Sequence, residues 1–297
     1  MRVAVTGSHG LIGTALLARL RAAGHEAVPI VRGAPAAGEI GWDPRAGRLE
    51  PRALRGLDAV VNLAGAGIGD KRWSDEYKRQ VLESRTRATT LLADTMAGLD
   101  DGPRTLLSGS AIGFYGDRGD EELDESSPPG RGFLAEVAEA WEATTAPASA
   151  AGLRVVHLRT GIVLAGHGGA LPRMLPLFKL GLGGRFGDGR QWMSWIALDD
   201  EIGAITHLLG SEVVGPVNLT APAPVRNGEL ADTIGEVLHR PTVLPVPAFG
   251  PKLVLGAERA DALLFQSQRV VPRVLQDDGF EWRFATLEPA LRAALGR

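Results

Sequence analysis

A glycine-rich segment, TGSHGLIG at Thr6–Gly13, joins a short apolar run to a segment with helical periodicity. In a strand–turn–helix unit, the first glycine makes the sharp turn, the second lets an anion approach the backbone amides, and the third lets the helix pack closely on the sheet. The spacing is G-x-x-G-x-x-G rather than the general G-x-G-x-x-G. A turn that binds no ligand is the alternative. We expect a dinucleotide diphosphate to bind through the following residues: Gly7, Ser8, Gly10, Leu11, Ile12 and Gly13.

Short β-branched runs alternate with helical segments in the first half of the chain, which is typical of βαβ units and a mostly parallel sheet. Strands are predicted at Arg2–Thr6, Ala27–Val31, Ala59–Leu63, Thr105–Ser108 and Arg154–Leu158. Helices are predicted at Leu11–Ala23, Asp75–Ala97 and Phe133–Ala151, and a further helix is predicted to open at Asp199-Asp200. The predicted fold class is therefore α/β, with a Rossmann-type doubly wound parallel sheet.

The alternation is lost after about residue 165, where Gly and Pro become dense. We expect residues 1–165 to form the dinucleotide-binding domain, with 196–222 returning to it. Residues 166–195 and 223–297 are expected to form a smaller C-terminal substrate lobe.

Composition excludes several kinds of function. The 297 residues carry 32 Lys and Arg against 35 Asp and Glu, so the net charge of −3 gives no reason to bind nucleic acid or an anionic membrane. The absence of cysteine excludes disulfides, thiolate catalysis and cysteine zinc sites. The six histidines include no H-E-x-x-H and no i,i+4 pair, so no metal site is predicted. With no secretory signal and no membrane span in the sequence, we expect a cytoplasmic protein.

The end of the second predicted strand distinguishes NAD from NADP. NAD-binding proteins usually present a carboxylate there, whereas a basic residue accommodates the 2′-phosphate of NADP. This chain has no acidic residue there and carries Arg32 at the tip. We therefore expect NADP(H) rather than NAD(H); the alternative is that Arg32 is a solvated cation at the strand end.

Further segments stand in an order and spacing that resemble a known family: Asp58–Gly65, Lys71–Trp73, Glu83–Arg85, Ser110–Gly116, Trp141-Glu142, Arg159–Leu164, Gly189–Ile196, Gln268–Pro272 and Gly279-Phe280. Together with the glycine-rich segment they are distributed over nearly the whole chain. The chain resembles the extended or atypical short-chain dehydrogenase/reductases, in particular the epimerase-like family of NAD-dependent epimerase/dehydratase type, which carries a distinct C-terminal lobe and includes nucleoside-diphosphate-sugar epimerases.

The resemblance implies roles for residues at the ends of the later strands. Leu63, Ala64 and Gly65 should line the adenosine and ribose side of the cofactor. Ser108 and Ser110 end the fourth predicted strand, where family members place a catalytic Ser or Thr beside the nicotinamide. The segment that runs past the nicotinamide carboxamide should contribute Arg159, Gly161 and Ile162.

The usual proton donor of the wider superfamily is missing. A tyrosine supplies the proton there, and a lysine four residues later lowers its pKa. Phe133 and Val137 occupy the expected positions. The only tyrosines, Tyr77 and Tyr115, are followed four residues later by valine and glycine, so the chain contains no Y-x-x-x-K.

Three residues could act near the nicotinamide instead. Ser110 can position a substrate oxygen but is a poor acid near neutral pH. Tyr115 follows a strand end, where its hydroxyl could face the cleft; the alternative is a half-buried loop aromatic. Glu136 is the third, but it is better interpreted as a carboxylate on the helix surface than as a catalytic group. We therefore name Ser110 and Tyr115 as the catalytic candidates.

The substrate-binding region also departs from the family pattern. Sugar-nucleotide epimerases commonly carry an arginine shortly before the paired aspartates, and Met193 stands at that position. The alternative is that Arg190 or Arg185 takes the place of that arginine. The apolar stretch from Gln191 to Trp195 fits a smaller or less charged ligand at least as well as a nucleotide sugar, so Gln191 and Trp195 are substrate candidates. Arg85 is a third candidate, because a cation on the inner face of its helix could bind an anionic group; a surface ion pair is the alternative.

Two functions follow from this sequence. The first is an NADP(H)-dependent oxidoreductase or epimerase-like enzyme with a small-molecule substrate. The second is a non-catalytic protein that senses NADP(H) or binds a partner. No sequence feature indicates an oligomeric state.

Overall fold

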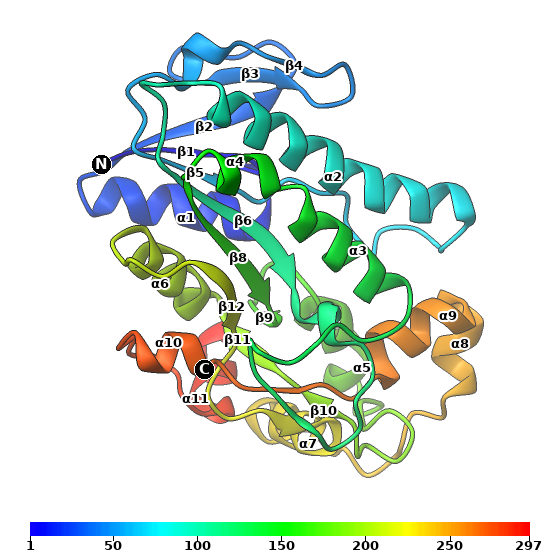
Figure 1. The fold of residues 1–297 in the computed structure, drawn as a ribbon. Helices are drawn as coiled ribbons and strands as arrows, with labels where there is room; N and C mark the ends of the chain where they lie inside the picture. Colours follow the sequence, from blue (N-terminus) through cyan, green and yellow to red (C-terminus); the bar gives the residue numbers. More distant parts are fainter. The chain divides into compact units, whose positions relative to one another are not determined.

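The computed structural model describes residues 1–297 and divides into two compact units (Figure 1). The first comprises Met1–Ala111, Glu136–Arg159 and Ala204–Val217. The second comprises Ile112–Ala135, Thr160–Gly203 and Asn218–Arg297. The returning segment lies inside the expected 196–222, whereas Ile112–Ala135, expected in the dinucleotide-binding domain, groups with the second unit. The second unit is about as long as the first, where we expected a smaller lobe.

An eight-stranded sheet runs through the first unit in the order β12-β8-β6-β5-β1-β2-β3-β4. Its strands are β1 (Arg2–Val5), β2 (Glu26–Arg32), β3 (Ile40–Asp43), β4 (Arg48–Leu49), β5 (Ala59–Asn62), β6 (Thr105–Ala111), β8 (Arg154–Thr160) and β12 (Gly215–Leu219). The neighbours from β6 through β5, β1 and β2 to β3 pair in parallel, and β3 and β4 pair antiparallel. The strand order reverses beside β1, which is the topological switch point of a doubly wound sheet. The predicted Rossmann-type fold class is confirmed.

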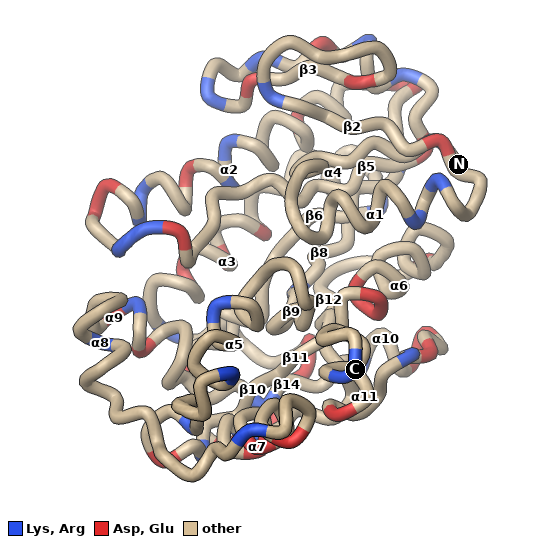
Figure 2. The backbone as a smooth tube through the Cα atoms, turned by 180° about the vertical axis from the view of Figure 1, so that it is seen from behind, with Lys and Arg blue, Asp and Glu red and all other residues tan.

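Helices cover both faces of this sheet. They are α1 (Leu11–Ala22), α2 (Asp75–Ala97), α3 (Phe133–Ala143), α4 (Ala146–Ala150) and α6 (Leu198–Leu209), with a 3₁₀ turn, η1 (Pro51–Leu54). Figures 1 and 2 show α2 and α3 on one face and α1 on the other. A strand covered on both faces has no polar side, and all four residues of β5 are buried.

The prediction of a single helix at Phe133–Ala151 is wrong, because this segment forms two helices, α3 and α4. The hydroxyls of Thr144 and Thr145 donate to the carbonyls of Trp141 and Glu142 at 2.6 and 2.8 Å. Threonine hydroxyls that bond back in this way compete with the backbone ladder. Pro147 has no amide hydrogen to continue the helix. The other predicted strands and helices of the first half lie within a few residues of the observed ones, and β3 and β4 were not predicted.

The second unit consists of short strand ladders and helices. Its elements are η2 (Ile112–Tyr115), β7 (Glu122–Leu123), β9 (Ile162–Leu164), α5 (Leu171–Lys179), β10 (Trp192–Met193), β11 (Trp195–Ala197), β13 (Val225–Arg226), α7 (Asn227–Leu238), α8 (Phe249–Leu255), α9 (Ala257–Ala260), η3 (Asp261–Phe265), β14 (Arg269–Val270), α10 (Arg273–Asp277) and α11 (Leu287–Leu295). Three two-stranded ladders pair β10 with β13, β11 with β9 and β14 with β7.

The helix predicted to open at Asp199-Asp200 begins one residue earlier, at Leu198. Asp200 accepts hydrogen bonds from the amides of Arg283 and Phe284 at 2.7 and 3.0 Å, so its carboxylate fixes the C-terminal segment of the second unit. The next residue, Glu201, is fully buried. One oxygen accepts from the Thr160 hydroxyl at 2.9 Å, the other has no hydrogen-bond partner, and burial raises the pKa of Glu201 to about 8.

Replacing Glu201 should change how stability depends on pH. Between the ordinary pKa of 4.5 and the folded value of about 8, the folded state binds one more proton than the unfolded state. The free energy of unfolding therefore falls as the pH rises through this window, by up to about 1.4 kcal/mol per pH unit. We expect Glu201→Gln to remove this part of the slope in urea unfolding followed across the window. Glu229→Gln, at an exposed position in the second unit, should keep the wild-type slope; equal slopes for both variants would contradict the assignment.

Candidate functional site

The glycine-rich turn connects β1 to α1 through close backbone contacts. Gly7 has a φ of +63°, and a Cβ added to it would lie 2.5 Å from the carbonyl oxygen of Leu63. A Cβ on Gly13 would lie 2.2 Å from the carbonyl oxygen of Gly7. These two positions therefore require glycine.

The amides at the start of α1 are free to bind an anion. Gly10 is the N-cap, and no side chain caps the helix. The first N–H groups of a helix have no partner within the helix and carry the positive end of its dipole. A diphosphate fits this chemistry, since backbone amides can approach it closely at the glycine positions of the turn. The geometry of the turn thus fits the predicted binding of a dinucleotide.

The registers of β1, β2 and β5 bring the other predicted cofactor residues to the same edge of the sheet. Val5 pairs with Pro29 and with Val61, so Arg32 and Leu63–Gly65 lie beyond the carboxyl end of β1, as the glycine turn does. Arg32 is exposed, and its side chain makes no hydrogen bond or ion pair in the protein. A guanidinium in this state is free to bind an anionic ligand.

A buried hydrogen-bond network supports this edge. The Thr6 hydroxyl donates to Asn62 Oδ1 at 2.7 Å and accepts from the Leu63 amide at 3.0 Å. Asn62 Nδ2 and the Trp141 indole both donate to the hydroxyl of Thr89, each at 2.8 Å. These bonds fix the ends of β1 and β5 against α2 and α3.

Ser110, the first catalytic candidate, lies in β6 and is held by a residue that the sequence analysis did not select. Its hydroxyl donates to Glu142 Oε1 at 2.7 Å. Arg159 donates to the same carboxylate from Nε at 2.8 Å and from Nη2 at 2.9 Å. The Arg159 side chain is only 4% exposed, so this is a buried bidentate ion pair. Trp141-Glu142 carried part of the family resemblance, but its spacing gave no sign of this contact.

The charge on Glu142 decides what Ser110 can do. Burial favours a raised pKa, but the hydrogen bonds and charge of Arg159, together with the Ser110 hydrogen bond, outweigh it and lower the pKa of Glu142. Burial lowers the pKa of the neighbouring His157. Glu142 is therefore ionised at neutral pH and accepts a hydrogen bond from the Ser110 hydroxyl. The oxygen of Ser110 is left to accept a hydrogen bond from a ligand.

Ser108, two residues earlier in β6, is fully buried, and its hydroxyl has no hydrogen-bond partner in the protein. Buried polar groups normally have a partner, so this unpaired hydroxyl is unusual. Contact of Ser108 with the cofactor stays a prediction. Glu136 is exposed on α3, as its helix-surface interpretation expects.

The remaining predicted site residues belong to the second unit. Tyr115 is fully buried, and its hydroxyl donates to Asn218 Oδ1 at 2.7 Å. Gln191 donates to the carbonyls of Phe186 and Leu264, and the Trp195 indole donates to a backbone carbonyl. These groups thus hold the second unit together, and a ligand contact at Tyr115, Gln191 or Trp195 stays a prediction.

Gly161 and Ile162 also lie in the second unit, where their amides donate to the carbonyls of Leu219 and Ser194 at 3.0 and 2.9 Å. A Cβ on Gly161 would lie 2.8 Å from the Ser194 carbonyl oxygen. The close packing explains the glycine, and contact of this segment with the nicotinamide stays a prediction.

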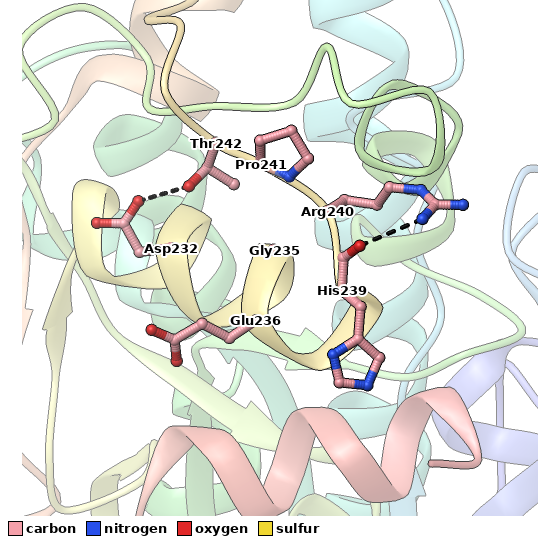
Figure 3. Close-up of a pocket in the computed structure, with 7 residues that line it drawn as sticks. All are labelled: Asp232, Gly235, Glu236, His239, Arg240, Pro241 and Thr242. Carbon is pink, nitrogen blue, oxygen red and sulfur yellow. Dashed lines mark hydrogen bonds between the residues drawn. The ribbon is translucent and has the colours of Figure 1, made fainter.

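A cavity of about 580 Å³ lies elsewhere in the second unit, at the end of α7 (Figure 3). Its polar groups largely satisfy one another: Thr242 donates to Asp232 at 2.8 Å, and Arg240 donates to the carbonyls of Lys179 and His239. Nothing in this lining resembles a dinucleotide site. No group of three or more His, Asp or Glu side chains is placed to hold a metal ion, and no helix has the length and apolar character needed to cross a membrane.

Glu142→Gln should destabilise the first unit, because the amide cannot compensate the buried charge of Arg159. Breaking a buried ion pair costs about 3–5 kcal/mol in the free energy of unfolding. Glu139→Gln, at an exposed position on the same helix, is the matched control and should stay within about 0.5 kcal/mol of the wild type. Urea unfolding followed by circular dichroism measures both. A Glu142→Gln loss no larger than that of the control would show that Arg159 does not need this partner.

Comparisons with known proteins agree with this geometry. The chain is 46% identical over 297 residues to the epimerase family protein Mb2239 of Mycobacterium bovis, covering 99% of this chain and 98% of that protein. It is 35% identical to the crystal structure of human epimerase family protein SDR39U1 with NADPH, with a TM-score of 0.90 and coverage of 100% and 99%. It is 39% identical to the crystal structure of the nucleoside-diphosphate sugar epimerase from Corynebacterium glutamicum, with a TM-score of 0.81, covering 100% of this chain and 58% of that one.

Two family models match the chain. Residues 246–294 match a domain of unknown function, DUF1731, which lies within the second unit. Residues 3–219 match the NAD dependent epimerase/dehydratase family. This match covers the glycine turn, the sheet edge and the Ser110 network described above. The chain belongs to the NAD dependent epimerase/dehydratase family.

Proposed function

We propose that the protein binds NADP(H) and acts as an oxidoreductase or epimerase-like enzyme on a small molecule. The observation that carries the proposal is the pairing of a glycine-rich turn, whose helix α1 has no side-chain cap, with an exposed, unpaired Arg32 at the same sheet edge. The human relative crystallised with NADPH supports this choice of cofactor. A cytoplasmic location stays a prediction.

The residues that would hold the cofactor follow from this edge of the sheet. The amides of Leu11, Ile12 and Gly13 would bind its diphosphate, and Arg32 would bind its 2′-phosphate. Leu63–Gly65 would border its adenosine and ribose, and Ser108 and Ser110 would lie toward the nicotinamide. When bound, the nicotinamide would supply hydride transfer at a carbon that bears an oxygen.

Ser110 would position the oxygen of the substrate. Because its own proton is held by ionised Glu142, its oxygen would accept a hydrogen bond from a substrate hydroxyl. We propose that the reaction proceeds without a Tyr-Lys pair. In support, the hydroxyls of both tyrosines are engaged in the protein, Tyr77 with the Gly67 carbonyl and Tyr115 with Asn218.

The missing Tyr-Lys pair also favours a second candidate, a non-catalytic protein that senses NADP(H) or binds a partner. The two candidates share the cofactor and differ in turnover. Purified protein that binds NADPH but changes no nicotinamide absorbance with a panel of carbonyls, alcohols and nucleotide sugars would favour the second.

Arg32→Ala should weaken NADPH binding selectively. Loss of a charge-assisted contact to the 2′-phosphate costs about 1.5–3 kcal/mol, or roughly a 10- to 150-fold rise in Kd for NADPH, with little change for NADH. Fluorescence titration with the two coenzymes measures this directly. Arg19→Ala, at an exposed position on α1, should leave both affinities unchanged. If Arg32→Ala weakened NADPH and NADH equally, the 2′-phosphate would not be read by this residue.

Ser110→Ala should lower kcat by about 100-fold or more on any substrate found, because the substrate oxygen loses its positioning group. The affinity for NADPH should stay within about twofold of the wild type. Ser149→Ala, at an exposed position on α4, is the control. Unchanged turnover in Ser110→Ala would remove this serine from the reaction.

A further inference from the structure

Arg85 carries a charge that the first unit does not neutralise. It lies in α2 and is partly buried. Its guanidinium packs against the loop after β5, since a Cβ on Gly65 would lie 3.1 Å from Arg85 Cζ. Its Cζ also lies 5.1 Å from the centroid of the Trp141 ring.

The hydrogen bonds of Arg85 leave most of its donors unused. Nη1 donates to the Val81 carbonyl at 3.0 Å, and the side chain makes no ion pair. The acidic residue of α2 nearest to it in sequence, Glu83, pairs with Arg87 at 2.9 Å. Burial lowers the pKa of Arg85 to about 10, which still leaves it charged at neutral pH. Nε and Nη2 remain able to donate to a planar oxyanion.

Three other arginines that stack on aromatic rings in this protein are neutralised. Arg226 and Arg269 stack on Trp192, and Arg283 stacks on Phe284. Each also pairs with a carboxylate, at 2.7, 3.2 and 2.7 Å respectively. Arg85 has the ring without the carboxylate, so an anion from outside the protein would complete the same arrangement.

Arg85 lies close to the proposed reaction site. The Trp141 ring on which it stacks also packs against β6, since a Cβ on Gly109 would lie 2.9 Å from that ring. Gly109 precedes Ser110, and Glu142, which follows Trp141, binds the Ser110 hydroxyl. One ring therefore borders both the free guanidinium and the strand that carries Ser110.

We propose that Arg85 binds an oxyanion of the substrate, a carboxylate or a phosphate, and that the substrate of this protein is therefore anionic. This rests on the proposed function, which assigns the cofactor diphosphate to the α1 amides and its 2′-phosphate to Arg32. Both anionic parts of the cofactor then have their own binding groups, and Arg85 is left for the substrate.

The test titrates the NADPH-loaded protein with inorganic phosphate and with oxalate by calorimetry. The wild type should bind these probes saturably. Arg85→Gln should weaken them at least about tenfold, since it loses a charge-assisted contact, while its affinity for NADPH, measured separately by fluorescence, stays within about twofold. Arg85→Lys should fall between the two, because lysine keeps the charge but not the bidentate geometry. Arg87→Gln, on the same helix but exposed, should match the wild type.

Several outcomes would overturn the proposal. These are equal probe binding by the wild type and Arg85→Gln, no probe binding by the wild type, or a loss of NADPH affinity in Arg85→Gln as large as the loss for the probes. The last outcome would assign Arg85 to the cofactor. Failure of the wild type to bind NADPH would instead refute the proposed function, and titration of the cofactor-free protein would still test Arg85.

A second measurement covers the case in which Arg85→Gln does not fold. Phenylglyoxal modifies accessible arginines, and phosphate should slow modification of Arg85 in the wild type while leaving Arg87 unaffected. Peptide mass analysis reads both sites in one sample. Equal rates at Arg85 with and without phosphate would also overturn the proposal.

Discussion

Backbone packs directly on backbone at the switch point of the sheet. Gly7 lies against the carbonyl of Leu63, and Gly13 lies against the carbonyl of Gly7, at distances that exclude a Cβ. This contact brings the start of α1 and the loop after β5 to one place. It also places Gly65, and through Gly65 the guanidinium of Arg85 on α2. The start of α1 and the position of Arg85 on α2, which are far apart in sequence, thus depend on the same close approach.

Glu142 has a comparable role at β6 and β8. Its carboxylate allows Arg159 to be buried with its charge, because a bidentate pair with a further hydrogen bond satisfies most of the lone pairs. The same carboxylate sets the direction of the Ser110 hydroxyl. A serine whose proton points at an ionised acid can accept a hydrogen bond but not supply a proton easily. The network therefore suits the orientation of a substrate oxygen and leaves protonation to another group.

Local features of the fold could be predicted from the sequence, and long-range contacts could not. The glycine turn, the parallel strands and the position of Arg32 follow from periodicity and from neighbouring residues. The break between α3 and α4 was missed, although Pro147 in the sequence cannot continue a helix. The contact between Ser110 and Glu142 joins residues 32 apart in sequence, and no spacing rule connects them. The burial of Trp195 likewise depends on a carbonyl 28 residues away.

The unpaired charge of Arg85 is explained by how its neighbours are used. Glu142 directly follows the tryptophan on which Arg85 stacks. Both oxygens of Glu142 are already occupied, Oε1 by Ser110 and Arg159 and Oε2 by Arg159. If Glu142 turned toward Arg85, it would leave Arg159 buried without a counter-charge, which costs more than leaving a partly exposed guanidinium unpaired. The fold therefore keeps one cation neutralised and one free, and the free one borders the strand that carries Ser110.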